Sequence, residues 1–311
     1  MSKEVKIGTR GSKLALYQAK RVKGELEQKF PEIQFALEII HTKGDKILDV
    51  ALSKIGDKGL FTKEIEQALL DGQIDLAVHS MKDLPTDLPE SLKLGAVLER
   101  GETREAFVAA KGRTLSDLNE NDIIGTSSVR RRAQLLAMNP KFKVVDIRGN
   151  VETRLNKWRS GHCTATIMAA AGIQRLELGE AISELVDIEK MVHAPAQGII
   201  AIETREEDPF IDSLMAGINH TETWIMAQAE YAFLAALGGG CQVPIACHSE
   251  VKDGEISITA QVLSPDGSRS IKQTVKSSTA QAVETAQKLA ASFLQQGALE
   301  IIGSIERQTT K

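Results

Sequence analysis

Cysteine is scarce in this chain, and long apolar runs are absent. Only three cysteines occur, Cys163, Cys241 and Cys247, and they form no CxxC pair. This number and spacing exclude a disulfide framework and a four-cysteine zinc site, so the sequence predicts no metal centre and a reducing compartment. No stretch reaches the roughly 18 apolar residues of a transmembrane helix, and the first residues lack the apolar core of a secretory signal. The sequence therefore predicts a cytoplasmic protein with no membrane partner.

A strong excess of charge is also missing. The 38 basic and 42 acidic side chains leave a net charge of −4, whereas a nucleic-acid binder needs a net basic face. Aromatic residues make up 4% of the chain, but the hydrophobic share of 42% and the charged share of 26% are ordinary for a soluble globular protein. Domains of about 100 to 150 residues predict two or three of them in a chain of 311 residues.

The first 200 residues alternate short β-rich segments with longer helical patterns, which is typical of α/β domains with covered sheets. The predicted strands are 5–7, 34–41, 74–78, 123–124, 144–147 and 166–168, and the predicted helices are 13–30 and 63–70. Charge and glycine content rise around residues 99–102, which indicates a crossover between domains.

The last third of the chain has a different pattern. An alanine-rich helix is predicted over 221–237, and Gly238 is suited to end it. Two alternating segments, 256–262 and 270–275, flank a turn, and an amphipathic helix follows over 280–296. This part is predicted to be a small α+β domain.

Two similar turns occur far apart in the sequence. Residues 7–12 and 124–128 each join a predicted strand through Gly-Thr to a serine that opens a helix. Helix N-termini bind anions through their free N–H groups and the helix dipole, so the repeat predicts two similar anion half-sites. Turn formation and helix capping alone would also explain the pattern.

Arginines accompany these turns. Arg10 lies in the first, Arg130 and Arg131 follow the second, and Arg148 and Arg154 flank the next glycine-containing turn. Because the guanidinium fork matches a carboxylate or phosphate, a convergent set would bind a small polyanion. Solvated surface charges remain the alternative.

A polar segment, His79 to Pro85, follows a predicted buried strand. Ligands of open α/β sheets bind at such carboxyl ends, so Asp83 beside Lys82 is a candidate to stabilise a cationic transition state. Asp83 is equally explained as a turn residue, and His79 is expected to have a structural role.

Cys241 follows three glycines, which predicts an accessible thiol, whereas Cys163 and Cys247 have apolar neighbours and are expected in the core. Lys54 and Lys58 lie in a glycine-containing segment that is either a cover over a site or a solvated loop.

Six segments in order resemble the hydroxymethylbilane synthase, or porphobilinogen deaminase, family over nearly the whole chain. They are Gly8-Thr9-Arg10, Lys58-Gly59-Leu60-Phe61, His79-Ser80-Met81-Lys82-Asp83-Leu84-Pro85, Gly125-Thr126-Ser127-Ser128, Asp146-Ile147-Arg148-Gly149-Asn150 and Gly239-Gly240-Cys241-Gln242-Val243-Pro244. The resemblance implies two domains built like type II periplasmic binding proteins, residues 1–98 with 195–217 and residues 99–194, and an α+β domain over 218–311. It also implies a monomer.

The resemblance further implies a reaction: four porphobilinogen molecules are joined head to tail with loss of ammonia on a dipyrromethane cofactor, and water then releases hydroxymethylbilane. Cys241 would hold this cofactor by a thioether, and Asp83 would be the catalytic aspartate. The residues implied to bind the cofactor are Ser12, Ser80, Lys82, Asp83, Thr126, Ser128, Arg130, Arg131, Arg148 and Gly149. Those implied to bind substrate are Arg10, Arg148, Arg154 and Arg175, and Lys54 and Lys58 would lie on the active-site loop.

Three positions depart from the family pattern. Tyr231 follows Glu230 where the family usually has arginine, His193 replaces a usual proline, and Thr164 replaces a common aspartate. None of them is Asp83 or Cys241.

Two other functions are compatible with these residues. A non-enzymatic binding module for a small polycarboxylate would use the same helix N-termini and arginines, although it has no need for a cysteine after glycines. A transferase with a free thiol at Cys241 is the other alternative.

Overall fold

A computed structural model describes residues 4–43, 62–239 and 243–303 of the chain. Lys54, Lys58 and Cys241 lie outside these ranges. The chain divides into two compact units, one made of Met1–Gly101 and Gly198–Trp224 and the other of Glu102–Gln197 and Ile225–Lys311.

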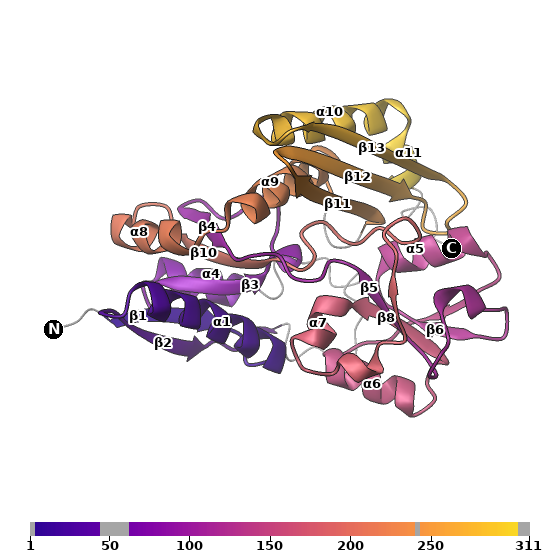
Figure 1. Ribbon diagram of the computed structural model, residues 1–311, viewed down its shortest axis with the longest axis horizontal. Helices are drawn as coiled ribbons and strands as arrows, with labels where there is room; N and C mark the ends of the chain where they lie inside the picture. Colours follow the sequence, from indigo (N-terminus) through magenta and orange to yellow (C-terminus); the bar gives the residue numbers. More distant parts are fainter. Residues whose placement is uncertain (1–3, 44–61, 240–242, 304–311) are drawn as a thin grey trace. The chain divides into compact units, whose positions relative to one another are not determined.

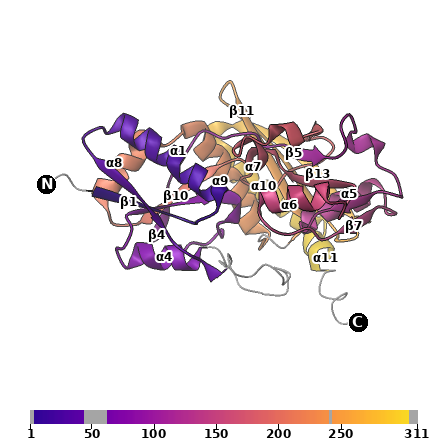
Figure 2. The same cartoon turned by 90° about the horizontal axis from the view of Figure 1, so that it is seen from below.

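The first unit is built on a five-stranded sheet in the order β2-β1-β3-β10-β4. Its strands are β1 (Glu4–Thr9), β2 (Gln34–Ile39), β3 (Leu76–Ser80), β4 (Leu92–Val97) and β10 (Ile200–Arg205). Strand β1 pairs in parallel with β2 and β3, whereas β10 is antiparallel to both β3 and β4. Figure 2 shows α1 (Lys13–Lys29) and α8 (Pro209–Ile218) on one face and α4 (Lys63–Leu70) on the other.

Helix α1 forms where the sequence predicts it. Ser12 caps its N-terminus, and the apolar side chains that it buries recur at helical spacing and pack on the sheet. The helix ends at Lys29 because Pro31 disfavours helical backbone at the residue before it, Phe30.

The second unit contains another five-stranded sheet, in the order β7-β6-β8-β5-β9. Its strands are β5 (Glu105–Val108), β6 (Ile123–Gly125), β7 (Lys143–Val145), β8 (Ala165–Ala169) and β9 (Glu184–Val186), and its helices are α5 (Val129–Met138), α6 (Val151–Arg159) and α7 (Ala170–Gln174). Strand β6 is parallel to β7 and β8, and β5 is antiparallel to β8 and β9. This strand order and pairing repeat those of the first sheet. The short sequence repeat of residues 7–12 and 124–128 therefore belongs to a repeat of the whole sheet.

The C-terminal part has an antiparallel meander of β11 (Ile245–Lys252), β12 (Glu255–Leu263) and β13 (Ser270–Ser278). Helix α9 (Thr221–Ala236) precedes it, and α10 (Ala282–Gln295) and α11 (Ala298–Gly303) pack on the sheet (Figure 1). Phe233 of α9 and Phe293 of α10 meet edge to face in its core, with ring centroids 5.3 Å apart. Four short 3-10 helices complete the described chain: Met81–Asp83, Leu115–Asp117, Gly179–Ala181 and Thr279–Gln281.

The expected fold class, two α/β domains of one pattern followed by a small α+β domain, is confirmed. Three predicted strands extend beyond those of the structure: the strand expected over 34–41 ends at Ile39, that expected over 144–147 spans Lys143–Val145, and that expected over 74–78 spans Leu76–Ser80. Ile74 is apolar and buried, yet its N–H bonds to Ala68 of α4 rather than to a neighbouring strand. Apolar periodicity reports burial and not strand pairing, which explains the shift of β3.

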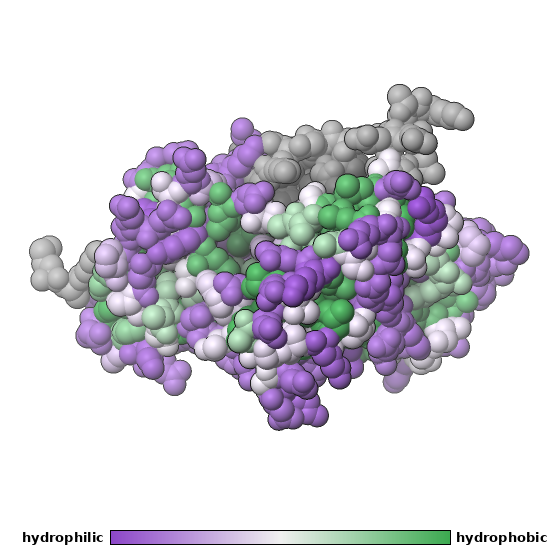
Figure 3. All heavy atoms as spheres, turned by 90° about the horizontal axis from the view of Figure 1, so that it is seen from above, coloured by the Kyte–Doolittle hydropathy of each residue, from purple (hydrophilic) through white to green (hydrophobic). Residues whose placement is uncertain are grey.

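No helix in the described part of the chain is both long and apolar enough to span a membrane. The face in Figure 3 is predominantly hydrophilic, with apolar residues interspersed among polar ones.

The turn between β12 and β13 packs closely on α5. Gly267 in this turn has a φ of +72°, and a Cβ there would lie 2.3 Å from the Ala137 nitrogen and 2.5 Å from the Ala133 oxygen. Gly254, in the turn between β11 and β12, has a similar φ of +79° but open space around it. Substitution at Gly254 would therefore introduce backbone strain alone, whereas substitution at Gly267 would add a steric clash with α5.

We expect Gly254→Ala to lower the free energy of unfolding by about 1 kcal/mol, the cost of left-handed backbone for alanine. Gly267→Ala should cost at least about 2 kcal/mol more, because backbone atoms of α5 must also move. Denaturant unfolding of both variants tests this, and equal losses would show that the turn does not need to approach α5 so closely.

Candidate functional site

The first anion-binding turn of the sequence lies at the carboxyl end of β1. Ser12 is the N-cap of α1, and its Oγ accepts a hydrogen bond of 3.2 Å from the Ala15 N–H. Arg10 is half-buried between the strand and the helix. The capping role of Ser12 is thus realised, and Arg10 stands at the sheet edge where ligands of such folds bind.

The segment with Asp83 lies at the same edge, because β3 is parallel to β1. Met81 is buried and its N–H donates to the Ile199 oxygen at 3.1 Å, which anchors the short helix Met81–Asp83. Lys82 is half-buried and Asp83 is exposed. The carboxylate of Asp83 is therefore available to a ligand on a turn that is itself held firmly.

Gln18 is a contact that sequence reasoning missed. It is 2% exposed on α1, and its Nε2 donates a 2.7 Å hydrogen bond to the Oγ of Ser80. Because the Ser80 oxygen accepts this hydrogen bond from Gln18, the Ser80 hydroxyl must donate its own hydrogen to a group other than Gln18 Nε2. The signal in the sequence was a polar residue on the apolar stripe of the helix, beside Ala15, Ala19 and Val22.

The second turn has the same design at the carboxyl end of β6. Ser128 caps α5 through a 3.4 Å bond from the Arg131 N–H, and its own N–H donates to Thr126 Oγ1 at 3.2 Å. Ser127 Oγ donates to the Ile147 oxygen and accepts from the Ile147 N–H, at 2.9 and 3.1 Å. These two bonds join this turn to the one that follows β7.

Arg130 and Arg131 are buried, not solvated: they are 5% and 6% exposed. Both pair with Glu105 of β5, which is fully buried. Carbonyl oxygens of Val192 and Ile167 accept from their other nitrogens, at 2.6 and 3.2 Å. Burial lowers the pKa of Arg130, while the charge of Glu105 opposes that shift.

This cluster has an uncompensated part. Two guanidinium groups share the single carboxylate of Glu105, which leaves one excess positive charge on the three side chains. The buried Nε of Arg131 has no hydrogen-bond partner in the described chain. An orphaned donor and an excess cation both fit an anionic ligand.

The turn after β7 places Arg148 and Gly149 beside the cap of α6. Gly149 has a φ of +112°, and a Cβ there would lie 2.5 Å from the Thr153 side chain, so this position requires glycine. Arg154 Nε donates to the Gly149 oxygen at 2.7 Å, and Lys157 Nζ donates to the Arg148 oxygen at 3.2 Å. Positive charge therefore surrounds this turn.

Arg175 is half-buried at the end of α7, the helix that follows β8. Strands β6, β7 and β8 are parallel, so the segments that follow them leave one edge of the second sheet. The structure thus gathers the predicted residues in two sets, one at a sheet edge in each unit. Arg10, Ser12, Ser80, Lys82 and Asp83 form the first set, and Thr126, Ser128, Arg130, Arg131, Arg148, Gly149, Arg154 and Arg175 form the second.

His193, one of the three departures from the family pattern, is fully buried. Its Nδ1 lies 2.7 Å from the Ala194 oxygen and must donate, so in the neutral ring its Nε2 accepts from Nδ1 of His248, also 2.7 Å away. The Cys247 N–H donates to the His193 oxygen. His193 therefore joins its segment to β11.

Thr164 and Tyr231 are the other two residues that depart from the family pattern. Thr164 Oγ1 donates to Asp122 at 2.8 Å, and Asp122 pairs with Arg113, which holds the pKa of that carboxyl well below its usual range. Tyr231 is half-buried, and Glu230 before it is fully buried and accepts from Ser249 Oγ at 2.7 Å.

The expectation for two of the cysteines is confirmed. Cys163 and Cys247 are buried, at 3% and 0% exposure, and burial raises the pKa of the Cys163 thiol. Neither is suited to act as a nucleophile.

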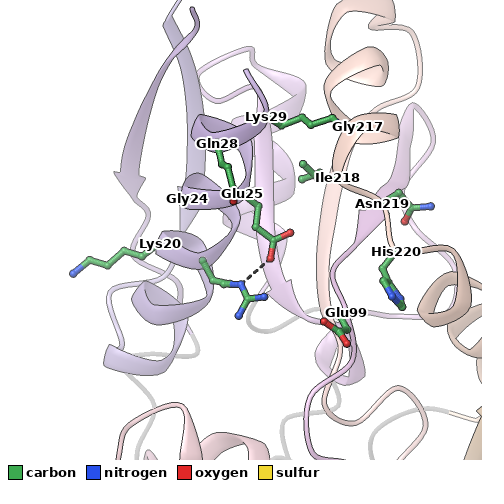
Figure 4. Close-up of a pocket in the computed structure, with 11 residues that line it drawn as sticks. Lys20, Gly24, Glu25, Gln28, Lys29, Glu99, Gly217, Ile218, Asn219 and His220 are labelled. Atoms are coloured by element: carbon green, nitrogen blue, oxygen red, sulfur yellow. Dashed lines mark hydrogen bonds and ion pairs between the residues drawn. The ribbon is translucent and has the colours of Figure 1, made fainter. Parts of the chain in front are cut away.

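A pocket of the first unit lies elsewhere, between α1 and the segment after α8 (Figure 4). Lys20, Lys29, Glu99 and His220 help to line it, and Arg21 in its wall pairs with Glu25 of the same helix at 2.7 Å. None of the site residues predicted from the sequence lines this pocket.

Comparison with solved structures found matches at low sequence identity and low TM-score. One is the probable amino-acid ABC transporter extracellular-binding protein of Bacillus subtilis, with a TM-score of 0.41 and 13% identity over 70% of this chain and 90% of that one. Another is a TRAP periplasmic solute binding protein of Desulfovibrio salexigens, with a TM-score of 0.44 and 12% identity over 73% of this chain and 74% of that one.

Sequence comparison is far more specific. A porphobilinogen deaminase of Syntrophomonas wolfei is 47% identical over 96% of this chain and 98% of its own, and that of Synechococcus elongatus is 46% identical over 98% and 96%. Residues 5–213 match the family model "Porphobilinogen deaminase, dipyromethane cofactor binding domain", and residues 224–295 match "Porphobilinogen deaminase, C-terminal domain". This chain therefore belongs to the porphobilinogen deaminase family, transferases of porphyrin biosynthesis that carry a dipyrromethane cofactor.

Proposed function

We propose that this chain is a hydroxymethylbilane synthase that condenses four porphobilinogen molecules on its dipyrromethane cofactor. The family match over nearly the full length carries this proposal. In each step a carbon–carbon bond forms between the free ring carbon of the chain end and the aminomethyl carbon of porphobilinogen. The aminomethyl carbon–nitrogen bond breaks and releases ammonia. The chain-end ring then loses the proton from the carbon that formed the new bond. Product release would hydrolyse the bond between the cofactor and the methylene carbon of the first substrate ring: water would supply hydroxyl to that methylene and a proton to the ring carbon left on the cofactor.

Asp83 is the proposed catalytic residue. Departure of ammonia leaves positive charge on the pyrrole, which is delocalised onto its ring nitrogen. A carboxylate that accepts the pyrrole N–H stabilises this charge as it develops. The exposed position of Asp83 on an anchored turn supports the role, because a fixed dipole or charge needs no reorganisation during the reaction.

The arginines are proposed to bind the carboxylates of the pyrrole rings. Each ring carries acetate and propionate groups, so the cofactor and the growing product are polyanions. The excess charge at Arg130 and Arg131 and the orphaned Nε of Arg131 fit such a ligand. Ser12, Ser80, Lys82, Thr126, Ser128, Arg148 and Gly149 are proposed to complete the cofactor contacts, with Arg10, Arg148, Arg154 and Arg175 at the substrate.

Cys241 is proposed to hold the dipyrromethane by a thioether. When bound, this cofactor supplies the pyrrole end to which the first substrate is joined. Soft sulfur is a good nucleophile toward the methylene carbon of a pyrrole, which explains a cysteine at this position. Lys54 and Lys58 are proposed for the active-site loop, and we expect a monomer in the cytoplasm.

Intact mass provides the first test. The protein isolated from cells that make porphobilinogen should be heavier than its sequence by two pyrrole units, and Cys241→Ser should lack this excess and be inactive. Cys163→Ser is the matched control and should keep both the mass and the activity, because that thiol is buried in the core.

An active protein of unmodified mass would refute the proposed attachment. Alkylation of Cys241 in that native protein would then favour the free-thiol transferase. Binding of a small polycarboxylate without turnover would favour a binding module.

The second test concerns Asp83. Asp83→Asn removes the negative charge with little change in size, so kcat should fall by at least about a hundredfold, as for other groups that stabilise charge in a transition state. Asp87→Asn, four residues away and also exposed, should keep wild-type kcat. Single-turnover release of ammonia from porphobilinogen measures both, and near-normal kcat in Asp83→Asn would exclude Asp83 from the chemistry.

A further inference from the structure

Three titratable side chains are buried directly behind the turn that carries Asp83. His79 of β3, Glu203 of β10 and Glu66 of α4 are 6%, 0% and 7% exposed. His79 Nε2 and Glu203 Oε2 lie 3.1 Å apart. None of the three is a residue proposed above to bind cofactor or substrate.

The sheet explains how these groups meet. Ala201 lies opposite His79 and Ala77 lies opposite Glu203, so the two polar side chains are diagonal neighbours on one face of the β3–β10 pair. This is the face that α4 covers, since Ala77 packs with Ile65 and Leu69 of that helix. The two small alanines leave room for the longer side chains in an otherwise apolar layer.

Stability alone does not account for this cluster. Buried charged pairs can often be replaced by apolar residues of similar volume at no loss of stability, because desolvation offsets the attraction, so burial of a polar pair is weak evidence for a stabilising role. The cluster is also incompletely bonded: Oε1 of Glu203 and Oε1 of Glu66 are buried without a hydrogen-bond partner in the described chain. Groups retained at such a cost are candidates for a functional role.

Burial raises the pKa of Glu66, and the negative charge of Glu203 adds to that effect, while Thr62, His79 and Lys63 oppose it. Glu66 is therefore the carboxyl that tends to keep its proton, and Glu203 is the one that pairs with His79.

The pair lies where β3 passes into the catalytic turn. His79 directly precedes Ser80, which pairs with Ile200, and the next N–H, of Met81, donates to Ile199. The first residues of β10 thus receive the end of β3 and the start of the turn. The side-chain bond from His79 to Glu203 adds a link between the same two strands one residue before the turn begins.

We propose that His79 and Glu203 are a buried positioning pair that holds the Ser80–Asp83 turn on β10 in its reactive place. The inference rests on the proposed role of Asp83. The pair does not touch the substrate in this proposal; it acts through the backbone that joins His79 to Asp83. A displacement of about 1 Å in a catalytic group can lower a rate about a hundredfold, so a small loosening of this turn is sufficient.

The test separates position from stability. In the double variant His79→Leu/Glu203→Met, apolar side chains of similar size replace the pair, so we expect an unfolding temperature no lower than that of the wild type. We also expect normal dipyrromethane loading by intact mass but a kcat at least about tenfold lower, with KM within about twofold. The single variant Glu203→Gln keeps a hydrogen-bond acceptor for His79. Its kcat should therefore stay close to that of the wild type and well above that of the double variant.

Asp75→Asn is the matched control. Asp75 lies before the opposite end of β3, where it accepts from the Lys6 N–H at 2.9 Å and pairs with Arg205 at 3.4 Å. Its loss should lower the unfolding temperature and leave kcat unchanged.

A folded and loaded double variant with wild-type kcat would overturn the positioning role. If the double variant does not fold, His79→Leu takes its place, and a kcat equal to that of Glu203→Gln would overturn the role as well. Asp83→Asn is measured alongside: an active Asp83→Asn contradicts the proposed function itself, whereas an inactive one with a fast double variant contradicts only the positioning pair.

The proton on Glu66 gives an independent prediction. Because the pKa of Glu66 is raised in the folded protein, the wild type loses stability as pH rises through that pKa, whereas Glu66→Gln stays neutral. The unfolding temperature of Glu66→Gln relative to wild type should therefore increase as the pH rises above about 4.3, the ordinary pKa of a glutamate.

Glu284→Gln is the control for this trend, because Lys288 lowers the pKa of Glu284 and the removal of that carboxylate should give no gain as pH rises. A difference between Glu66→Gln and wild type that is the same at every pH would show that Glu66 is not the member of the cluster that holds the proton.

Discussion

The antiparallel pairing of β10 with β3 is the contact on which the first unit depends. Strand β10 is formed by residues that follow the whole of the second sheet in the chain, yet it lies between β3 and β4. Without it β4 would have no partner in the sheet, and the end of β3 would lack the strand that receives Met81. The turn with Asp83 therefore depends on a segment more than a hundred residues away in sequence.

In the second unit, strand β5 has the same place that β10 has in the first. This strand is antiparallel and lies between β8 and β9, as β10 lies between β3 and β4. Each of these two strands also carries a buried carboxylate, Glu203 on β10 and Glu105 on β5. Glu203 pairs with one histidine, whereas Glu105 pairs with two arginines and leaves positive charge in excess. The same architecture thus places a buried histidine–glutamate pair before the Asp83 turn in one unit and a buried cluster with excess positive charge in the other.

Local features of the fold were predictable because their causes are local. The start of α1 at Lys13 follows from Ser12 as its cap, and its end at Lys29 follows from Pro31. The repeated Gly-Thr turns were visible for the same reason, since both end in a serine that caps a helix. The burial of Arg130 and Arg131 was not predictable, because their partner Glu105 and the Val192 and Ile167 carbonyl groups come from distant segments.

The sequence by itself determined the family, the candidate chemistry and, to within two residues, the bounds of helices α1, α4, α9 and α10, because ordered motifs, caps and apolar periodicity depend on residues that are close along the chain. Only the tertiary structure decided the place of β10 in the first sheet, the contact from Gln18 to Ser80 and the buried pair of His79 and Glu203. These contacts join segments 62 and 124 residues apart, and nothing in the spacing of either segment identifies its partner. The residues proposed to react could thus be named from the sequence, whereas the residues proposed to hold them in place required the fold.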